Sequence, residues 1–426
     1  MHDLDKQKQS WTVILSVVSM AVGLSIVDLS NSDRQFLSSV TLAADPSEGG
    51  ELLVLDAVPD FEQGRTYIND KKYKKAIHAF NQAEVKGLKL YELFTLRGLA
   101  YHELRQFQNA KRDAEKAIEL QPAKMLGYEL LAGVHYAMGH ADETIDVATN
   151  GLAKVEGIEK AKLQRERGIL LLMLGRTEDS IKDFTRAEEL GETSEILYYN
   201  RGRAYSGLGR YELALQDLSK AHTIAPEYEK ALRARGWVYD CVGDLEKSVA
   251  DFDQLLDKSP KDLLTRRLRG VVRIRMGDKE GGLADLRYAL EAGSQDPWTF
   301  LNAAAAYFAH ENTAKALEVN EQGLALKVPD SEYELQFQRG ILLLHSGRGK
   351  EAGKFFKKAT TSALKKQDLL ALQEAIADLK QEIQYRPHLA GVADPILKEL
   401  ERTLAETKAA HKPRMEQCQR FKNRGE

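Results

Sequence analysis

Cysteine is nearly absent from this chain, at 2 residues in 426, and so is any excess of charge of one sign. The two thiols, Cys241 and Cys418, are too few for a disulfide framework or for a zinc site built from cysteines. The 61 Lys and Arg nearly cancel the 64 Asp and Glu, which leaves a net charge of -3. This balance disfavours a protein that coats nucleic acid or anionic lipid.

Residue patterns that would mark an enzyme are also missing. His102 and His310 are each followed by Glu, but Gln106 and Ala314 stand where a zinc protease has its second histidine. Residues 349–354 imitate a phosphate-binding loop, yet only three residues separate the two glycines. The sequence therefore predicts no catalytic residue, no metal site and no cofactor.

One long apolar run stands near the N-terminus. Residues 9–27 carry no charge, and the apolar stretch 11–27 follows Lys6 and Lys8 and precedes Asp28. Its length is close to the minimum that spans a bilayer, and cations before it favour export of the rest of the chain. We expect residues 1–27 to be a signal anchor that holds the protein in the membrane or cell envelope, with the repeats outside the cytoplasm. A cleaved signal peptide and a packed helix are the alternatives, and residues 28–56 are expected to form a linker.

Small residues recur at a fixed interval through residues 57–366. Two further sets of mostly small residues follow the first at constant offsets, starting at Ala76 and Ala83, and only Leu255 interrupts the last set. Such columns predict antiparallel helices whose backbones cross so closely that larger side chains do not fit. The first column, with spacings of 34 or 36 residues, is Gly64, Gly98, Ala132, Gly168, Gly202, Gly236, Gly270, Ala304 and Gly340.

Turn residues and aromatic residues complete the repeating unit. Tyrosines recur three residues after the first small position, as at Tyr67 and Tyr101, and glycines mark turns at Gly139, Gly175, Gly209, Gly243 and Gly277. The pattern resembles the tetratricopeptide repeat, with nine copies starting at residues 57, 91, 125, 161, 195, 229, 263, 297 and 333. The resemblance implies an all-α fold, a right-handed superhelix (an α-solenoid) whose first helices line a concave inner face.

Arginine and aspartate occur together in the repeats. Where arginine precedes the first small residue, aspartate follows sixteen positions later in five repeats, whereas the repeats with Leu131 and Ala303 lack both charges. Because the two charges are either both present or both absent in these repeats, they predict an ion pair between the two helices of one repeat. Arg339, opposite Phe355, is the exception. The predicted pairs are Arg97–Asp113, Arg167–Asp183, Arg201–Asp217, Arg235–Asp251 and Arg269–Asp285.

Beyond the last repeat, two further helices are expected. Apolar residues with 3-4 spacing from Leu369 to Ile383 predict one helix with a single apolar face. Asp394-Pro395 is read as the start of a second helix, which carries Leu397 and Leu400. We expect residues 367–411 to cap the last repeat, with dimerisation as the alternative, and residues 412–426 to form a solvated, mobile basic tail.

The inner face implied by the resemblance is where binding residues are expected. Arginines beside tyrosine and tryptophan can bind a carboxylate while an extended segment lies against flat apolar surface. We expect a non-catalytic scaffold that captures segments of partner proteins. Self-assembly into a homo-oligomer and RNA binding are alternatives, and the charge balance counts against RNA. The candidate groove residues are Arg165, Tyr199, Asn200, Arg203, Arg233, Trp237, Arg267, Arg275, Trp298 and Phe308.

Overall fold

A computed structural model describes residues 57–329, 331–366 and 368–422. Within these ranges the chain forms 20 α-helices and one short 3-10 helix, without a β-strand. The predicted all-α fold class is therefore confirmed. The expected anchor and linker, residues 1–56, lie outside the described residues. Within the described ranges, no helix combines the length and the apolar character needed to cross a bilayer.

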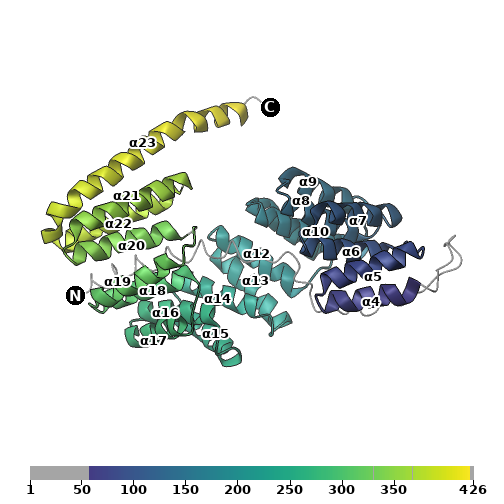
Figure 1. Ribbon diagram of the computed structural model, residues 1–426, viewed down its shortest axis with the longest axis horizontal. Helices are drawn as coiled ribbons and strands as arrows, with labels where there is room; N and C mark the ends of the chain where they lie inside the picture. The colour runs from purple at the N-terminus through teal and green to yellow at the C-terminus, as the bar shows by residue number, and fades with distance from the viewer. Residues whose placement is uncertain (1–56, 330, 367, 423–426) are drawn as a thin grey trace. The chain divides into compact units, whose positions relative to one another are not determined.

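The chain divides into two compact units at Val238, within α14 (Glu229–Val242), and each unit is described by itself. In both, consecutive helices pair as antiparallel hairpins (Figure 1). The first unit holds α4 (Val58–Asn69), α5 (Tyr73–Val85), α6 (Tyr91–Glu103), α7 (Phe107–Leu120), α8 (Met125–Ala137), α9 (Ala141–Leu152), α10 (Gly157–Met173), α11 (Thr177–Glu189), α12 (Glu195–Gly207) and α13 (Tyr211–Ile224). The second holds α15 (Leu245–Lys258), α16 (Leu263–Met276), α17 (Lys279–Glu291), α18 (Pro297–Ala309), α19 (Thr313–Ala325), α20 (Glu332–His345), α21 (Gly349–Lys365), α22 (Leu369–Tyr385), the 3-10 helix η3 (Pro387–Leu389) and α23 (Ala390–Lys422).

The turn inside each hairpin places one residue in the left-handed region of backbone conformation. Glycine suits this position because it has no Cβ, whereas an ordinary residue there is disfavoured by about 1–2 kcal/mol. Lys71, Arg105 and Glu311 nevertheless take it in three hairpins, with φ of 57°, 57° and 59°. The predicted turn glycines Gly139, Gly175, Gly209, Gly243 and Gly277 all have φ between 71° and 94°.

The small residues lie where two helices cross, as predicted. A Cβ placed on Gly64 would come within 2.5 Å of the Phe80 ring, and the ring of Phe80 is fully buried. Gly270 and Gly282 face each other across a hairpin, so that a Cβ on either would meet the other's carbonyl oxygen, at 2.9 and 2.5 Å. The backbones therefore approach as closely as the sequence pattern requires.

Four of the five predicted Arg–Asp pairs are confirmed. In each, the arginine Nε and Nη2 donate to the two oxygens of one carboxylate at 2.7–3.0 Å, which is the bidentate geometry of a strong ion pair. Arg235 and Asp251 belong to different units, so their pairing stays a prediction. The confirmed pairs are Arg97–Asp113, Arg167–Asp183, Arg201–Asp217 and Arg269–Asp285.

These arginines also reach the preceding hairpin, which the sequence pattern did not reveal. Nη1 of Arg201 donates to Glu188 Oε2 at 2.6 Å, and Nη1 of Arg269 donates to Asp253 Oδ1 at 2.5 Å. One guanidinium thus binds its own hairpin with one edge and the neighbouring hairpin with its other nitrogen. Each of these Arg–Asp pairs therefore links three helices.

Two repeats that lack the Arg–Asp pair have other contacts at the equivalent positions. The guanidinium of Arg339, the predicted exception, lies 5.3 Å from the ring centre of Phe355 in its own hairpin, and its Nη2 donates to Glu321 Oε2 of the preceding hairpin at 3.0 Å. In the hairpin of α18 and α19, Asn320 Nδ2 donates to Gln338 Oε1 and Gln338 Nε2 donates to the carbonyl of Leu301, both at 2.9 Å. Buried side-chain amides thus link neighbouring helices there, as the Arg–Asp pairs do in other repeats.

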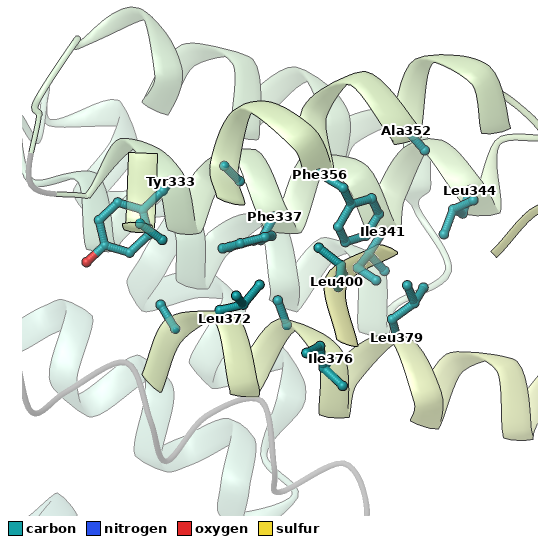
Figure 2. Packing of buried hydrophobic residues seen from close by; sticks show 14 of the residues in the cluster. Tyr333, Phe337, Ile341, Leu344, Ala352, Phe356, Leu372, Ile376, Leu379 and Leu400 are labelled. Carbon is teal, nitrogen blue, oxygen red and sulfur yellow. The ribbon is translucent and has the colours of Figure 1, made fainter. Parts of the chain in front are cut away.

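The C-terminal helices cover the last hairpin. Leu372, Ile376 and Leu379 of α22 are buried in one cluster with Phe356 of α21, and Leu400 of α23 joins them (Figure 2). The apolar stripe predicted from the sequence is thus used within the chain, as expected for a cap.

The second C-terminal helix differs from its prediction at both ends. α23 begins at Ala390, directly after η3, and not at Asp394-Pro395. Residues 391–393 contain no proline, so nothing in them prevents an earlier start. The backbone is helical through Lys422, where a mobile tail was expected, although Pro413 lies within this stretch.

Candidate functional site

Six of the ten candidate groove residues lie on three first helices of the first unit. Helical spacing decides which of them share a face, since residues four positions apart are neighbours on a helix surface. This places Tyr199 with Arg203 on α12, and Arg233 with Trp237 on α14. Arg165 lies on α10.

Arg203 differs from the other candidate arginines in its partners. Its guanidinium lies 5.5 Å from the ring centre of Tyr199, and the edge of that ring meets Tyr228 with the centres 5.3 Å apart. No carboxylate lies within ion-pair distance of Arg203 among the described residues, whereas Arg233 has Glu229 at 3.7 Å. Arg203 therefore presents a half-buried cation whose hydrogen-bond donors are not matched by an acid.

Trp237 adds a second unmatched donor to this part of the unit. Its half-buried ring packs on the cluster of Ala214, Leu218, Ala234 and Val238, and Tyr199 packs on the same cluster. Its indole Nε1 is shielded from solvent and has no hydrogen-bond partner within the part of the chain that the structure describes. A shielded N–H without an acceptor is unfavourable, but because this atom is closed off from solvent, only the ring of Trp237 is open to a partner.

Arg165 and Asn200, by contrast, use their polar groups within the unit. Arg165 Nε donates to Glu166 Oε1 at 2.9 Å, and Nη1 lies 3.4 Å from Glu192 Oε1. Burial alone would lower the pKa of Arg165, but these two carboxylates raise it above its ordinary value. Asn200 Nδ2 donates to the carbonyl of Ile196 at 2.9 Å. Both residues are buried, which favours a structural role for each.

The two candidate arginines of the second unit are also paired. Arg267 is buried, and its Nε lies 2.8 Å from Asp296 Oδ2. Burial lowers the pKa of Arg267, and Asp296 opposes that effect. Arg275 forms an ion pair with Asp240. These ion pairs join neighbouring hairpins and leave little charge for a partner.

The two candidate aromatic residues of the second unit contribute to packing. Trp298 is only 7% exposed and lies in a cluster with Leu301 and Leu335, so it is a core residue and not part of an open surface. The helix of the next repeat covers the face that a single repeat would leave open. Phe308 is half-buried, with its ring edge-on to His345 at 4.6 Å between centres.

Sequence reasoning missed Tyr228, which supports Tyr199. Tyr228 precedes α14 and stands outside the repeating columns, so periodicity could not find it. Its position two residues after Pro226 was the available signal, because a residue beside a turn is often fixed in place. In the described parts of the chain, no group of three His, Cys, Asp or Glu residues could hold a metal ion.

The chain is similar to repeat proteins over parts of its length. Family models described as tetratricopeptide repeat match residues 91–124 and 196–228. Human sperm-associated antigen 1 is 26% identical over 146 residues, which is 34% of this chain and 15% of the relative. Hsp70-Hsp90 organizing protein 2 of Arabidopsis thaliana is 28% identical over 91 residues, 21% of this chain and 16% of the relative. The chain thus spans less than a fifth of either relative.

One solved structure illustrates the structural likeness. A tetratricopeptide repeat protein from Parabacteroides merdae aligns with a TM-score of 0.46 at 19% identity. The alignment covers 57% of this chain and 96% of that protein.

Proposed function

We propose that this chain, a tetratricopeptide repeat protein, is a non-catalytic scaffold that captures segments of partner proteins on its first unit. The capturing surface is formed by Tyr199, Arg203 and Trp237, and we call it the Arg203 surface. The observation that carries the proposal is the cation of Arg203, which rests on an aromatic ring without an acid to neutralise it. A relative named as an organizing protein for Hsp70 and Hsp90 supports proteins as the class of partner.

The chemistry of the Arg203 surface selects acceptors beside apolar groups. Arg203 offers charged donors to a carboxylate, and Trp237 offers its half-buried ring to apolar groups. Stacking on Tyr199 holds the guanidinium in place before a partner arrives, so less side-chain freedom is lost on binding. An extended segment with acidic and apolar side chains fits these requirements.

Replacing Arg203 is expected to weaken capture without unfolding the chain. The measurement is titration calorimetry with synthetic peptides that alternate Glu with apolar residues, compared with the same peptides carrying Gln. Loss of one charged hydrogen bond, about 1.5–3 kcal/mol, predicts that Arg203→Ala binds the acidic peptides about tenfold to a hundredfold more weakly. Trp237→Phe, which keeps an aromatic ring but removes the shielded N–H, is expected to change the affinity much less than Arg203→Ala does.

Arg186 provides the matched control, because it is exposed on α11 and pairs only with Glu189 in the described chain. Arg186→Ala is expected to bind as the parent does. Equal affinity of the parent and Arg203→Ala for the acidic peptides would rule out the Arg203 surface as the capture site.

We further propose that residues 11–27 hold the scaffold in a membrane, with the repeats on the far side from the cytoplasm. The uncharged apolar run and the lysines before it support this location. Deleting residues 11–27 is expected to move the protein from the membrane pellet to the soluble fraction. Protease added to the exported side of intact cells or vesicles should digest the repeats of the full chain. Repeats that stay protected there, or a deletion variant that still sediments with membranes, would contradict the proposal.

A further inference from the structure

Cations gather at the turns of the first two hairpins. Residues 71–75, which end the turn after α4 and begin α5, include four lysines, and Arg105 stands in the equivalent turn after α6. All five residues are exposed. We call this set the basic patch, which consists of Lys71, Lys72, Lys74, Lys75 and Arg105.

The two turns that carry the basic patch lie side by side. Tyr73, which stands among the lysines, packs against the same apolar cluster as Ala100 of α6. Burial raises the pKa of Tyr73 and the charge of Glu103 adds to this effect, so the carboxylate at the end of α6 lies close to the first turn. Arg105 follows Glu103 by two residues. The five cations therefore form one surface across both turns.

Most cations of the basic patch have no acid as a partner. Lys72 Nζ lies 2.7 Å from Asp70 Oδ2, and both of these side chains are about half exposed. The other four cations lie beyond ion-pair distance of every carboxylate in the described chain. Five cations face only two adjacent acids, Asp70 and Glu103, although the whole chain carries a net charge of -3. The excess of positive charge is therefore local.

Two cations of the patch occupy positions that suit glycine better. Lys71 and Arg105 both have φ of 57°, in the left-handed region that glycine takes in other hairpins, as at Gly139. Glu311 has a similar conformation in the second unit, so the backbone strain does not by itself select a cation. It does mean that folding fails to explain the two charges, which favours a role in binding.

The chemistry of the basic patch fits an extended anionic surface. Four of its five cations are lysines, whose ammonium groups are strongly hydrated point charges on flexible stems. Tyr67 and Tyr73 pack against the apolar cluster, so their rings are not free to stack with bases of a nucleic acid. Among the described residues 67–77 and 101–107, no large apolar side chain is exposed. Attraction to this surface would therefore come from charge and not from insertion into a bilayer.

We propose that the basic patch holds the first hairpin against a membrane surface that contains anionic phospholipids. This hairpin is the described one nearest in sequence to the apolar run 11–27, and residues 28–56 lie between them. The choice of lipid as the partner rests on the membrane location proposed above, whereas the excess of charge does not. The equivalent turns of the second unit carry Asp244 and Asp278, which the same lipids would repel.

Cosedimentation with vesicles tests this contact. The variant that lacks residues 11–27 keeps every described residue and cannot bind through the apolar run. At about 0.1 M salt, we expect it to bind vesicles of phosphatidylcholine with about 30% phosphatidylglycerol at least about tenfold more tightly than vesicles of phosphatidylcholine alone. Binding should be lost as salt approaches about 1 M, because the Debye length falls from about 10 Å to about 3 Å.

Removing charge from the basic patch should weaken binding to the anionic vesicles. Lys74→Gln/Lys75→Gln removes two cations, each of which contributes about fivefold near an anionic surface, so the affinity should fall about thirtyfold. The matched control is Lys116→Gln/Lys182→Gln, made in the same background, which removes two exposed lysines of the same unit that pair with acids. The control should bind as the unsubstituted deletion variant does.

A second pair of substitutions separates binding from folding. Lys71→Gly/Arg105→Gly relieves the left-handed backbone, so its thermal midpoint should equal or exceed that of the unsubstituted protein, while its affinity for anionic vesicles should fall about thirtyfold. Equal binding to neutral and anionic vesicles would overturn the lipid contact. Undiminished binding by either patch variant, or tighter binding to a single-stranded DNA oligomer than to anionic vesicles, would also overturn it.

A salt wash distinguishes this contact from the membrane location proposed for residues 11–27. Salt at about 0.5 M releases a protein held by surface charge but not one held by an inserted apolar run. A deletion variant that stays in the salt-washed membrane pellet would therefore contradict the location of the apolar run. The vesicle results test the basic patch separately, so either proposal can fail without the other.

Discussion

Replacing Arg201 with Leu is expected to lower the free energy of unfolding of the first unit by about 3–5 kcal/mol. Asp217 is 3% exposed and would be left as a buried charge without a cation. Glu188 of the preceding hairpin would lose the same partner. The loss is large because burying an unpaired carboxylate is far more unfavourable than burying the pair. Urea unfolding followed by circular dichroism measures it.

A double replacement shows whether the pair is the cause. Arg201→Leu/Asp217→Val puts the residue types of the uncharged repeat, Leu131 and Val147, in place of the pair. This variant should be more stable than Arg201→Leu alone, since no buried charge is left unpaired. Additive losses in the two single variants would refute the coupling. Arg210→Leu is the control, because Arg210 is exposed and its contact with Glu178 is expected to contribute about 1 kcal/mol at most.

Gly282→Val is the second large expected loss, at about 3 kcal/mol. A Cβ at Gly282 would lie 2.5 Å from the carbonyl oxygen of Gly270 and 2.5 Å from a side-chain carbon of Ile274. The side chain of Ile274 can rotate away, but the oxygen belongs to the backbone of α16 and can move only with the helix. The hairpin of α16 and α17 would have to separate, and thermal unfolding of the second unit would shift downward.

Gly207 is the matched control for this prediction. It ends α12, and a Cβ there would have nothing within 4 Å. Gly207→Val is therefore expected to change stability by about 0.5 kcal/mol or less. Equal effects of Gly207→Val and Gly282→Val would mean that helix propensity, and not the close crossing, explains the glycine columns.

The hairpins were predictable because their requirements are local and repeat. A turn that needs a left-handed residue favours glycine, as at Gly139, and a close crossing demands a small residue, as at Gly64. The Arg–Asp pairs could be predicted for the same reason, since both partners lie in one repeat and are separated by sixteen positions. Arg201 and Asp217 could therefore be paired from the sequence alone.

The candidate site was predictable only in part. Column positions located Tyr199, Arg203 and Trp237 on the first helices, but they equally selected Trp298, which the next repeat covers. Whether a side chain at such a position is exposed to solvent depends on the size of the residues in the next repeat. Periodicity within a repeat carries no information about that.

The sequence by itself determined an array of helical hairpins, since small residues and turns at a 34-residue interval leave few other ways to pack. Only the tertiary structure decided which charged side chains form ion pairs and which do not. Arg165 and Arg203 both lie on first helices, yet the first meets Glu166 and Glu192 while the second meets the ring of Tyr199. The physical reason is that side chains distant in sequence meet in the fold, as Glu192 does with Arg165 across 27 residues, and sequence spacing does not fix such distances.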